Sequence, residues 1–313
     1  MSLRIVFMGT PQYGVPSLEA LIAAGYDVVG VFCQPDKPSG RGHKVIACPV
    51  KQCAQQHGIP VFQPQKTRVD GVEPLRQLAP DLCVTAAFGH ILSQEVLDIP
   101  RLGTVNVHAS LLPKYRGSAP VNWALMMGET VTGVTTMLTD RGMDTGDILM
   151  ARAVEIDPQE DAGMLTERLA GVGAELLIET LRAIERGDCP RIKQNEDEAT
   201  YYPLLKKETG IMDLTQTAVH LANQVRGLSP RPGAYIGEYK ILWAEPEVWE
   251  GQEAAGTILK ADPKQGLLVR AGEGALRIVR LQAPGGKAMD ARDYLRGHRM
   301  EAGTLIVPER TDG

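Results

Sequence analysis

The chain has 313 residues, of which 43% are hydrophobic and 23% are charged, and its formal net charge is −5. This length and apolar content suffice for two packed domains, and the acidic balance excludes a protein that binds nucleic acid through bulk positive charge. Because the chain lacks a signal-peptide pattern and any apolar run long enough to span a membrane, we expect a cytoplasmic protein that does not bind a membrane.

Short apolar segments alternate with helical ones in the first part of the chain. The predicted elements are a strand over 4–8, a helix over 16–24, a strand over 28–32, a helix over 50–57, an apolar segment over 60–62, a helix over 72–78 and a strand over 82–87. This βαβ pattern predicts an α/β fold with a parallel, Rossmann-like sheet. The turn from Gly9 to Gly14 lacks the second glycine of the dinucleotide fingerprint, so a nicotinamide enzyme is not indicated.

Polar residues lie at the end of a predicted strand in the middle of the chain. Valine alternates with polar residues from Val105 to His108, so Asn106 and His108 should point to the same side. Proline and glycine then bring the chain out of the sheet between Ser110 and Gly117. After a helix from about 120 to 127 and a strand over 134–139, the loop over 140–147 can return a carboxylate towards the first loop. An asparagine, a histidine and an aspartate could then meet in one crevice.

Each of these residues also has a purely structural interpretation. A single histidine on a strand is more often a hydrogen-bonded structural residue than a catalyst. Asp-Arg-Gly and Asp-Thr-Gly in the loop over 140–147 are ordinary turn sequences. The same loop lacks the alternating acidic ligands and the closing glutamate of a calcium-binding EF-hand. The five cysteines show no zinc-binding spacing and fit reduced thiols, and no metal is expected.

The remainder of the chain changes character near residue 187. A strand over 148–156 and an amphipathic helix over 164–185 complete the first part, and a polar connector without periodicity follows. Beyond residue 206, a helix over 215–226 precedes several short strands separated by Gly, Pro and Asp, which predicts a small β-barrel. Its Lys and Arg residues nearly balance its Asp and Glu residues. A modest basic face remains possible, built from Arg270, Arg277, Arg280 and Lys287.

Several motifs give the chain a specific family resemblance. It resembles the folate-dependent formyltransferases through Asn106-x-His108, Ser110-Leu-Leu-Pro113, Tyr115-Arg-Gly117 and Gly142-Met-Asp-Thr-Gly-Asp147. Phe7 to Pro11, Pro35 to Gly42, Val225 to Ala234 and Leu281 to Lys287 are similar to the members that act on methionyl-tRNA. The resemblance spans nearly the whole chain. The departures are Ser118, Asn122 and the segment Phe88-Gly89-His90, and they leave the Asn-His-Asp set intact.

The resemblance implies a division of the chain and a role for particular residues. It implies a catalytic domain over 1–188, a linker over 189–206 and an OB-like, tRNA-binding domain over 207–313. The implied catalytic residues are Asn106, His108 and Asp144. The implied folate-binding residues are Ser110, Leu111, Leu112, Pro113, Phe88, Gly89 and His90, and the implied tRNA-binding residues are Arg41, Lys37 and Lys44. The expected formyl donor is 10-formyltetrahydrofolate, which leaves as tetrahydrofolate. The expected acceptor is initiator methionyl-tRNA. The protein is expected to be a monomer.

Two other classes of function stay open. A formyltransferase for a sugar nucleotide, a purine intermediate or another small amine would share Asn106, His108 and Asp144 but should lack the insertion at 35–42 and the carboxyl-terminal domain. A binding module without catalysis would explain that domain and leave the Asn-His-Asp set unexplained. Ser110 lacks a nucleophile-elbow setting, so the sequence does not indicate a serine acyl-enzyme.

Overall fold

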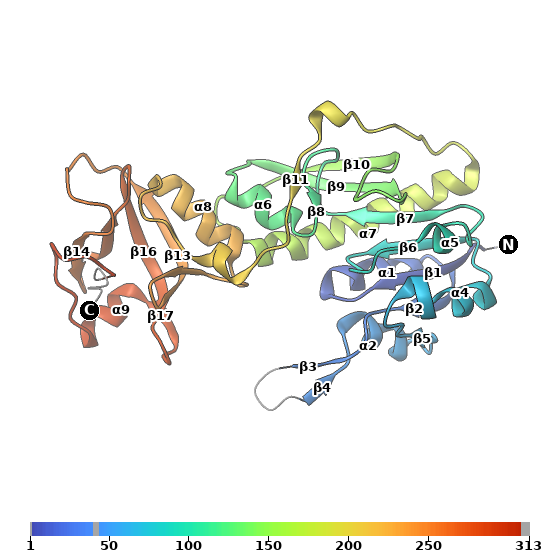
Figure 1. Cartoon of the computed structure of the whole chain (residues 1–313), viewed down its shortest axis with the longest axis horizontal. Helices are drawn as coiled ribbons and strands as arrows, with labels where there is room; N and C mark the ends of the chain where they lie inside the picture. Colours follow the sequence, from blue (N-terminus) through green and yellow to red (C-terminus); the bar gives the residue numbers. More distant parts are fainter. Residues whose placement is uncertain (1, 40–43, 308–313) are drawn as a thin grey trace. The chain divides into compact units, whose positions relative to one another are not determined.

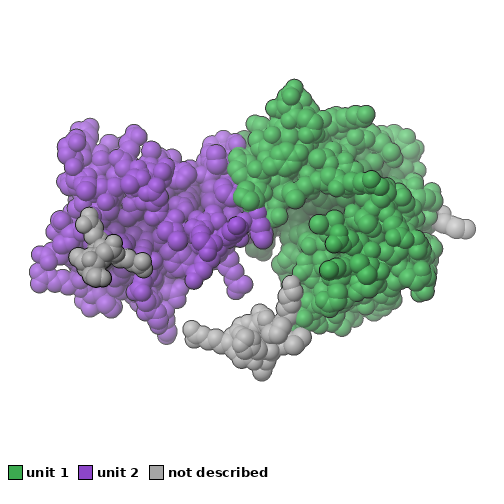
Figure 2. Space-filling view, viewed as in Figure 1, with its two compact units in different colours: residues 1–120, 131–155, 166–203 green, residues 121–130, 156–165, 204–313 purple. Residues whose placement is uncertain are grey.

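The structure, a computed structural model, describes residues 2–39 and 44–307. The chain divides into two compact units, which Figure 2 colours green and purple. Unit 1 comprises residues 1–120, 131–155 and 166–203. Unit 2 comprises residues 121–130, 156–165 and 204–313. Both units are therefore built from separate stretches of the sequence.

Unit 1 contains a seven-stranded sheet with the strand order β10-β9-β7-β6-β1-β2-β5 (Figure 1). Its strands are β1 (Arg4–Gly9), β2 (Asp27–Phe32), β5 (Val61–Phe62), β6 (Leu82–Ala86), β7 (Thr104–His108), β9 (Val131–Leu138) and β10 (Ile148–Glu155). The pairs β1–β2, β2–β5, β1–β6 and β6–β7 are parallel. The expected Rossmann-like parallel sheet is confirmed for these five strands.

The edge formed by β9 and β10 departs from a purely parallel sheet. Strand β9 runs antiparallel to both β7 and β10. A loop of nine residues joins β9 to β10, and a connection this short pairs strands antiparallel because a parallel pair needs a longer crossover. The helix that precedes β9, α6 (Pro120–Met126), lies almost entirely in unit 2 and provides no crossover on this sheet.

The long helix α7 (Ala162–Arg186) covers the apolar face of β7 and β9. A Cβ atom on Gly173 would lie 2.8 Å from Val107 Cγ1 and 3.4 Å from Val134 Cγ1, so the helix backbone approaches the sheet at this glycine. The hydroxyls of Thr136 and Thr180, both fully buried, are 2.8 Å apart across the same interface. This packing fixes which side of β7 faces the core.

The remaining helices and strands of unit 1 are short. They are α1 (Val15–Ala23), α2 (Pro49–Gln56), α3 (Thr67–Asp70), α4 (Val72–Leu78), α5 (Gln94–Leu97), the 3-10 helices η1 (Gln12–Gly14) and η2 (Glu196–Glu198), and the paired strands β8 (Arg116–Gly117) and β11 (Tyr201–Tyr202). One hydrophobic cluster of this unit contains Val6, Met8, Phe32, Leu75 and Phe88. The helices predicted over 16–24, 50–57 and 72–78 are confirmed to within about two residues.

The insertion after β2 contains a hairpin that the sequence did not predict. No strand was expected between the strand over 28–32 and the helix over 50–57, but β3 (Lys37–Ser39) and β4 (Lys44–Ile46) pair antiparallel. Both strands of a two-stranded ribbon are edge strands. An edge strand tolerates a residue without an N–H donor, which explains the presence of Pro38 in β3. Arg41, the principal predicted tRNA contact, lies outside the described residues.

The carboxyl-terminal part was expected to form a small, OB-like β-barrel of short strands, and the structure shows that unit 2 is built around an antiparallel sheet. Its order is β12-β13-β16-β15-β14, and β17 also pairs with β16. The strands are β12 (Ala234–Ile236), β13 (Tyr239–Glu247), β14 (Ile258–Asp262), β15 (Gly266–Arg270), β16 (Ala275–Gln282) and β17 (Ala288–Asp290). The 3-10 helix η3 (Lys207–Gly210) and the helices α8 (Ala218–Leu228) and α9 (Ala291–Gly297) belong to the same unit. The short elements β12, β17 and α9 were not predicted.

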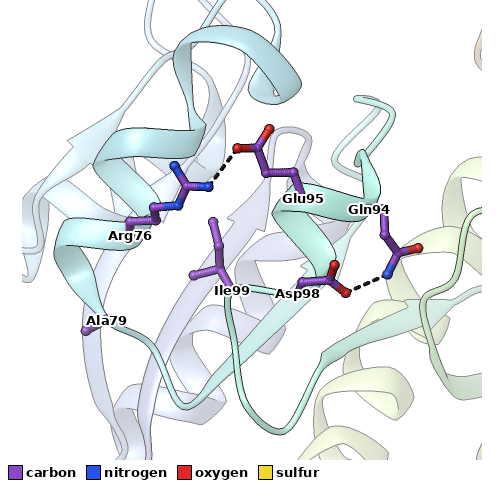
Figure 3. Close-up of a pocket in the computed structure, with 6 residues that line it drawn as sticks. All are labelled: Arg76, Ala79, Gln94, Glu95, Asp98 and Ile99. Carbon is purple, nitrogen blue, oxygen red and sulfur yellow. Dashed lines mark hydrogen bonds and ion pairs between the residues drawn. The ribbon is translucent and has the colours of Figure 1, made fainter.

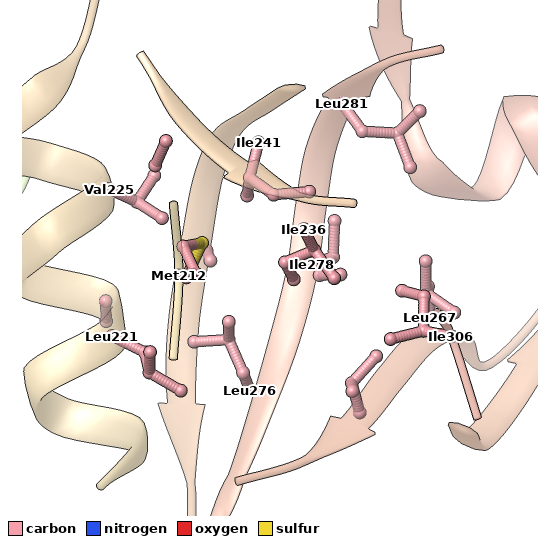
Figure 4. Close-up of a cluster of buried hydrophobic side chains, with 14 of the residues drawn as sticks. Met212, Leu221, Val225, Ile236, Ile241, Leu267, Leu276, Ile278, Leu281 and Ile306 are labelled. Carbon is pink, nitrogen blue, oxygen red and sulfur yellow. The ribbon is translucent and has the colours of Figure 1, made fainter. Parts of the chain in front are cut away.

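The core of unit 2 joins the sheet to α8 and α6. Leu221 and Val225 of α8 face Ile241, Leu276 and other strand residues in one cluster of buried side chains (Figure 4). The α6 helix joins this core, and a Cβ atom on Gly227 would lie 2.5 Å from Met126 Cγ. The amide of Asn122 also donates to the Gly227 carbonyl at 2.7 Å. Residues 121–130 thus pack as part of unit 2.

Across the described residues, we find no helix that combines the length and the hydropathy required to cross a membrane.

We predict that Leu276→Ala destabilises unit 2 by about 2–5 kcal/mol, because Leu276 is fully buried and its truncation leaves a cavity. Tryptophan fluorescence during urea unfolding measures this effect selectively, since Trp123, Trp243 and Trp249 all belong to unit 2. Val219→Ala on α8 is the control, because Val219 is 58% exposed and its truncation should change the midpoint little. Equal midpoints for the two variants would contradict this account of the core.

Candidate active site

His108 lies at the carboxyl end of β7 with both ring nitrogens near protein acceptors. Its Nε2 is 3.0 Å from the Tyr115 carbonyl oxygen, so this nitrogen carries the proton and donates. Its Nδ1 is 3.7 Å from Asp144 Oδ1. The contact between Nε2 and the Tyr115 carbonyl has the length of a hydrogen bond, whereas Nδ1 and Asp144 Oδ1 are too far apart for one. The ring is therefore oriented by Tyr115, and a gap separates its other nitrogen from a carboxylate.

Asn106 lies two residues earlier on the same strand and on the same side. Its Oδ1 accepts a hydrogen bond of 2.8 Å from the hydroxyl of Thr85, which is its partner on the neighbouring strand β6. Because the amide oxygen is engaged, the groups that Asn106 can direct towards a substrate are its N–H donors. Asn106 is half-buried, whereas His108 is buried, with 6% of its surface exposed. The strand thus presents an oriented amide beside an oriented imidazole.

Asp144 reaches this strand because the loop after β9 doubles back. Leu138, the last residue of β9, pairs with Val105 near the beginning of β7, so the loop starts at the wrong end of that strand for a contact with His108. The loop nevertheless places the Asp144 carboxylate beside the histidine, and Asp144 Oδ2 accepts a hydrogen bond of 2.9 Å from the Gly117 backbone N–H. The predicted convergence of the two loops is present in the structure.

The segment after β7 is held by hydrogen bonds within unit 1. Ser110 is fully buried and its hydroxyl donates to the Lys114 carbonyl at 2.7 Å. The Thr135 hydroxyl donates to the Ser110 carbonyl at 2.7 Å and accepts from the Leu112 N–H at 3.1 Å. Ser110 is therefore a structural anchor and not an exposed nucleophile. Of the four residues predicted to bind folate here, Ser110 and Leu112 are buried, while Leu111 and Pro113 are partly exposed.

The second segment predicted to bind folate follows β6. The Phe88 ring is buried in the core cluster of unit 1, and His90 Nδ1 is 2.9 Å from the Thr67 hydroxyl. The two rings lie 4.9 Å apart at an angle of 53°. Gly89 between them is exposed and has a φ of +76°, a conformation that favours glycine. The exposed part of this segment is therefore mainly backbone.

Arg116 connects the site to the polar segment beyond residue 187. Its side chain is fully buried although it is charged. It donates to Gln194 from Nε and Nη2 at 3.0 and 2.8 Å, and to Glu196 from Nη1 and Nη2 at 2.9 and 2.8 Å. A further N–H group of Nη1 donates to the Tyr201 hydroxyl. Sequence reasoning missed these partners because an irregular polar segment carries no periodic signal that marks a contact.

Charge pairing shifts the ionisation of both ends of this contact. The hydrogen bond from Arg116 lowers the pKa of Glu196 below its ordinary value, because the contact favours the carboxylate. Hydrogen bonding to Glu196 is likewise the main cause that raises the pKa of Arg116. The contact therefore favours the ionised form of both side chains.

We predict that Glu196→Gln lowers stability at neutral pH and that its deficit shrinks in acid. The folded-state pKa of Glu196 is depressed, so its contribution is complete above the unfolded value of about 4.3 and is lost as the pH falls through the folded value. Urea midpoints of both proteins, followed by circular dichroism, test this at about pH 7 and about pH 3.5. A deficit that does not change with pH would show that ionisation of Glu196 contributes nothing.

An open pocket elsewhere in unit 1 has the wrong composition for this chemistry. It has a volume of about 710 Å³ and is lined by Arg76, Ala79, Gln94, Glu95, Asp98 and Ile99 (Figure 3). Its polar groups bind one another, since Arg76 Nη2 donates to Glu95 at 2.7 Å and Gln94 donates to Asp98 at 2.6 Å. No residue of the Asn-His-Asp set lines it. We therefore assign the candidate active site from the side-chain geometry at β7.

The predicted tRNA-binding residues are only partly described. Lys37 and Lys44 lie on β3 and β4 of the hairpin. The hairpin is anchored at its base, where Lys51 donates to Asp36 at 2.5 Å and Gln63 donates to the other Asp36 oxygen at 2.8 Å. In the part of the chain that the structure describes, no three His, Cys, Asp or Glu side chains gather as metal ligands.

Comparisons of structure place the fold among formyltransferases. An N-formyltransferase from Helicobacter canadensis, in complex with folinic acid and dTDP-3-aminofucose, superposes with a TM-score of 0.68 at 19% identity and covers 88% of this chain and 99% of its own. HypX from Aquifex aeolicus, in complex with tetrahydrofolic acid, has a TM-score of 0.62 at 18% identity over 97% of this chain and 51% of its own. At these identities the likeness establishes the fold alone.

Comparisons of sequence establish the family. The formyl transferase family matches residues 3–181, and the formyl transferase carboxyl-terminal domain matches residues 204–299. The methionyl-tRNA formyltransferase of Caldanaerobacter subterraneus subsp. tengcongensis is 47% identical over 97% of this chain and all of its own length. That of Geobacter sulfurreducens is 48% identical over 97% of this chain and 96% of its own length. The predicted resemblance is confirmed, and the chain belongs to the methionyl-tRNA formyltransferase family.

Proposed function

We propose that this chain transfers the formyl group of 10-formyltetrahydrofolate to the α-amino group of methionyl-tRNA. The products are N-formylmethionyl-tRNA, which is used to initiate translation, and tetrahydrofolate. Support comes from family membership over nearly the whole chain and from one geometric observation. That observation is the position of His108, whose Nε2 is fixed by the Tyr115 carbonyl at 3.0 Å while its Nδ1 faces Asp144 across 3.7 Å.

The reaction sets requirements that this geometry meets. The amine nitrogen attacks the formyl carbon, the carbonyl electrons move to the oxygen, and an oxyanion develops that needs fixed donors. The Asn106 amide supplies N–H donors that do not titrate, and the Thr85 hydroxyl orients them by engaging the amide oxygen. The Nδ1 side of His108, protonated, supplies a second donor in the same direction. Donors already oriented in this way stabilise the oxyanion without reorganising during the reaction.

Asp144 handles the proton and the charge beside His108. The attacking amine must lose a proton and the folate nitrogen must gain one as it leaves. The Asp144 carboxylate stabilises a protonated His108 and accepts the amine proton, directly or through water. This proton then passes to the folate nitrogen as the bond between that nitrogen and the formyl carbon breaks. Its other oxygen is occupied by the Gly117 N–H at 2.9 Å, which leaves Oδ1 as the oxygen that faces the reaction. The scheme forms no covalent intermediate with the protein.

The formyl donor fits beside the loops that follow β6 and β7. Leu111 and Pro113 are partly exposed and apolar, and the exposed backbone at Gly89 offers hydrogen-bonding groups. A pterin ring combines a broad apolar face with polar edges, which suits such a mixture. We assign folate binding to residues 88–90 and 110–113, mainly through the exposed backbone of Gly89 and the partly exposed Leu111 and Pro113, because Ser110 and Phe88 are buried.

The remaining assignments follow from the family. We propose that the hairpin insertion, with Arg41, Lys37 and Lys44, contacts the acceptor end of the initiator tRNA, and that the carboxyl-terminal antiparallel domain contributes further contacts. An arginine can bind phosphate or base edges with two parallel hydrogen bonds, which a lysine cannot reproduce. We further propose that the enzyme is a monomer that works in the cytoplasm, where aminoacyl-tRNA is available.

We predict that Asn106→Ala and His108→Ala each lower kcat for formylation of methionyl-tRNA by about a hundredfold or more, on the scale of a lost oxyanion donor. Asp144→Asn should also lower kcat while it preserves side-chain size. The assay supplies 10-formyltetrahydrofolate and measures formylated methionine. Val131→Ala, which truncates an exposed side chain at the start of β9 without removing a donor, is the control. A folded His108→Ala protein with undiminished turnover would disprove the mechanism.

We predict that Arg41→Leu impairs formylation at limiting methionyl-tRNA while folate binding is preserved, and that Arg41→Lys restores only part of the loss. Kinetics on full-length methionyl-tRNA, compared with folate affinity, separate the two effects. Arg186→Leu is the matched control, because it removes an equal charge from the exposed end of α7. If Arg41→Leu and Arg186→Leu behave alike, the insertion does not carry recognition through Arg41.

A further inference from the structure

We propose that Gln194 is a positioning residue for formyl transfer, which it supports by holding the main chain of the Asp144 loop. The inference rests on the proposed function, because it assigns Gln194 to the same site. Gln194 lies in the polar segment after α7, which the sequence indicated to be a surface connector. It is half-buried, whereas its neighbours Lys193 and Asn195 are exposed. Its burial has a specific cause in the contacts of its amide.

The side-chain amide of Gln194 uses its full hydrogen-bonding capacity. Its Nε2 donates to the carbonyl oxygens of Asp144 and Gly146, both at 2.8 Å. Its Oε1 accepts from Arg116 Nε at 3.0 Å and from Arg116 Nη2 at 2.8 Å. An amide has two N–H donors and two acceptor lone pairs, so each is occupied. The orientation of Gln194 is thereby fixed from both ends, by a buried guanidinium and by the loop.

The loop that Gln194 holds needs external support. Asp144 has a φ of +57°, which lies in the left-handed region that non-glycine residues adopt at some cost. A Cβ atom on Gly146 would lie 1.7 Å from the Leu138 carbonyl oxygen, so the chain there passes close to the end of β9. Such a conformation persists when surrounding contacts determine it. The two hydrogen bonds from Gln194 hold the carbonyl groups of Asp144 and Gly146, within the segment where the chain adopts this conformation.

The arrangement fixes Asp144 through one short segment. Gly117 donates to the Asp144 carboxylate at 2.9 Å, and the adjacent Arg116 orients Gln194, which binds the Asp144 carbonyl. Strand β8 therefore holds Asp144 in two ways: Gly117 binds its side chain directly, and Arg116 holds its main chain through Gln194. The distance of 3.7 Å between Asp144 and His108 depends on this double attachment. A loop released on its main-chain side would let the carboxylate drift from the imidazole.

The test compares Gln194→Leu, Gln194→Glu and Asn195→Ala. We expect Gln194→Leu to lower kcat by up to about a hundredfold, the scale of a displacement of about 1 Å, with little change in KM for either substrate. Gln194→Glu should be impaired as well, because a carboxylate still accepts from Arg116 but cannot donate to the two carbonyls. Asn195→Ala is the matched control, since the Asn195 side chain donates to Glu198 and accepts from the Asp197 N–H, within its own short segment. Undiminished kcat in folded Gln194→Leu would overturn the inference.

A double-mutant cycle distinguishes positioning from a general structural effect. If Gln194 acts through Asp144, then Gln194→Leu should cost little further activity in an Asp144→Asn protein, so that the two losses are not additive. Fully additive losses, or a rise in KM with unchanged kcat, would instead assign Gln194 to stability or to binding and overturn the proposal.

A readout that needs no turnover separates this inference from the proposed function. Backbone amide exchange over residues 139–147 should quicken in Gln194→Leu and stay unchanged in Asn195→Ala. If wild-type protein forms no formylmethionine, the proposed function fails, while faster exchange in Gln194→Leu still shows that Gln194 holds the loop. If His108→Ala abolishes turnover but Gln194→Leu changes neither kcat nor exchange, only the inference on Gln194 fails.

Discussion

A buried guanidinium must have its hydrogen bonds satisfied, and this requirement at Arg116 organises the site. The side chain is fully buried, and its five N–H donors match five hydrogen bonds, to Gln194, Glu196 and Tyr201. Loss of any partner would leave a buried charge incompletely paired, which is costly. The segment after α7 is thereby held against the loop after β7, although about eighty residues separate them in the sequence. The strand pair β8–β11 lies at this junction.

The chemistry that we propose depends on side chains whose orientation is set by other groups. Thr85 engages the oxygen of Asn106, the Tyr115 carbonyl engages Nε2 of His108, and Gly117 engages one oxygen of Asp144. In each case a contact with a neighbouring group leaves one defined atom to face the substrates. Preorganised dipoles of this kind account for much of the catalytic effect at sites where charge develops. The sheet places Asn106 and His108 on one strand, and contacts with the neighbouring strand and with the following segment orient their side chains.

The sequence predicted the parts of the fold that are recorded in local periodicity. Alternation from Val105 to His108 placed Asn106 and His108 on one side of a strand, and leucine spacing predicted α7. Motif chemistry further indicated that Asp144 returns to His108, and the side chains do approach to 3.7 Å. The antiparallel direction of β9 was not predictable, because a strand pattern reads the same in both directions. The β3–β4 hairpin was missed for a different reason, since Pro38 and the surrounding glycines are typical of loops.

Contacts between distant segments were beyond the reach of sequence patterns. Gln194 and Glu196 lie in an irregular polar stretch, where hydrogen-bonding side chains cannot be told apart from solvated ones. The burial of Arg116 was equally unsignalled, because arginine is usually exposed. Family resemblance pointed to the residues that we propose for the reaction, whereas the residues that hold them became visible only in the folded structure.

The discontinuous composition of unit 2 limits how this protein can be divided. Met126 and Trp123, which precede β9 in the sequence, pack into the same core as α8 and the antiparallel sheet. A gene cut near residue 203 would separate α6 from the core that it completes and would leave its apolar side chains facing water. The carboxyl-terminal part therefore cannot be exchanged between relatives as an independent module unless residues 121–130 and 156–165 are exchanged with it. Exchange of unit 2 within this family thus requires five junctions in the gene, at the bounds of three segments, rather than one.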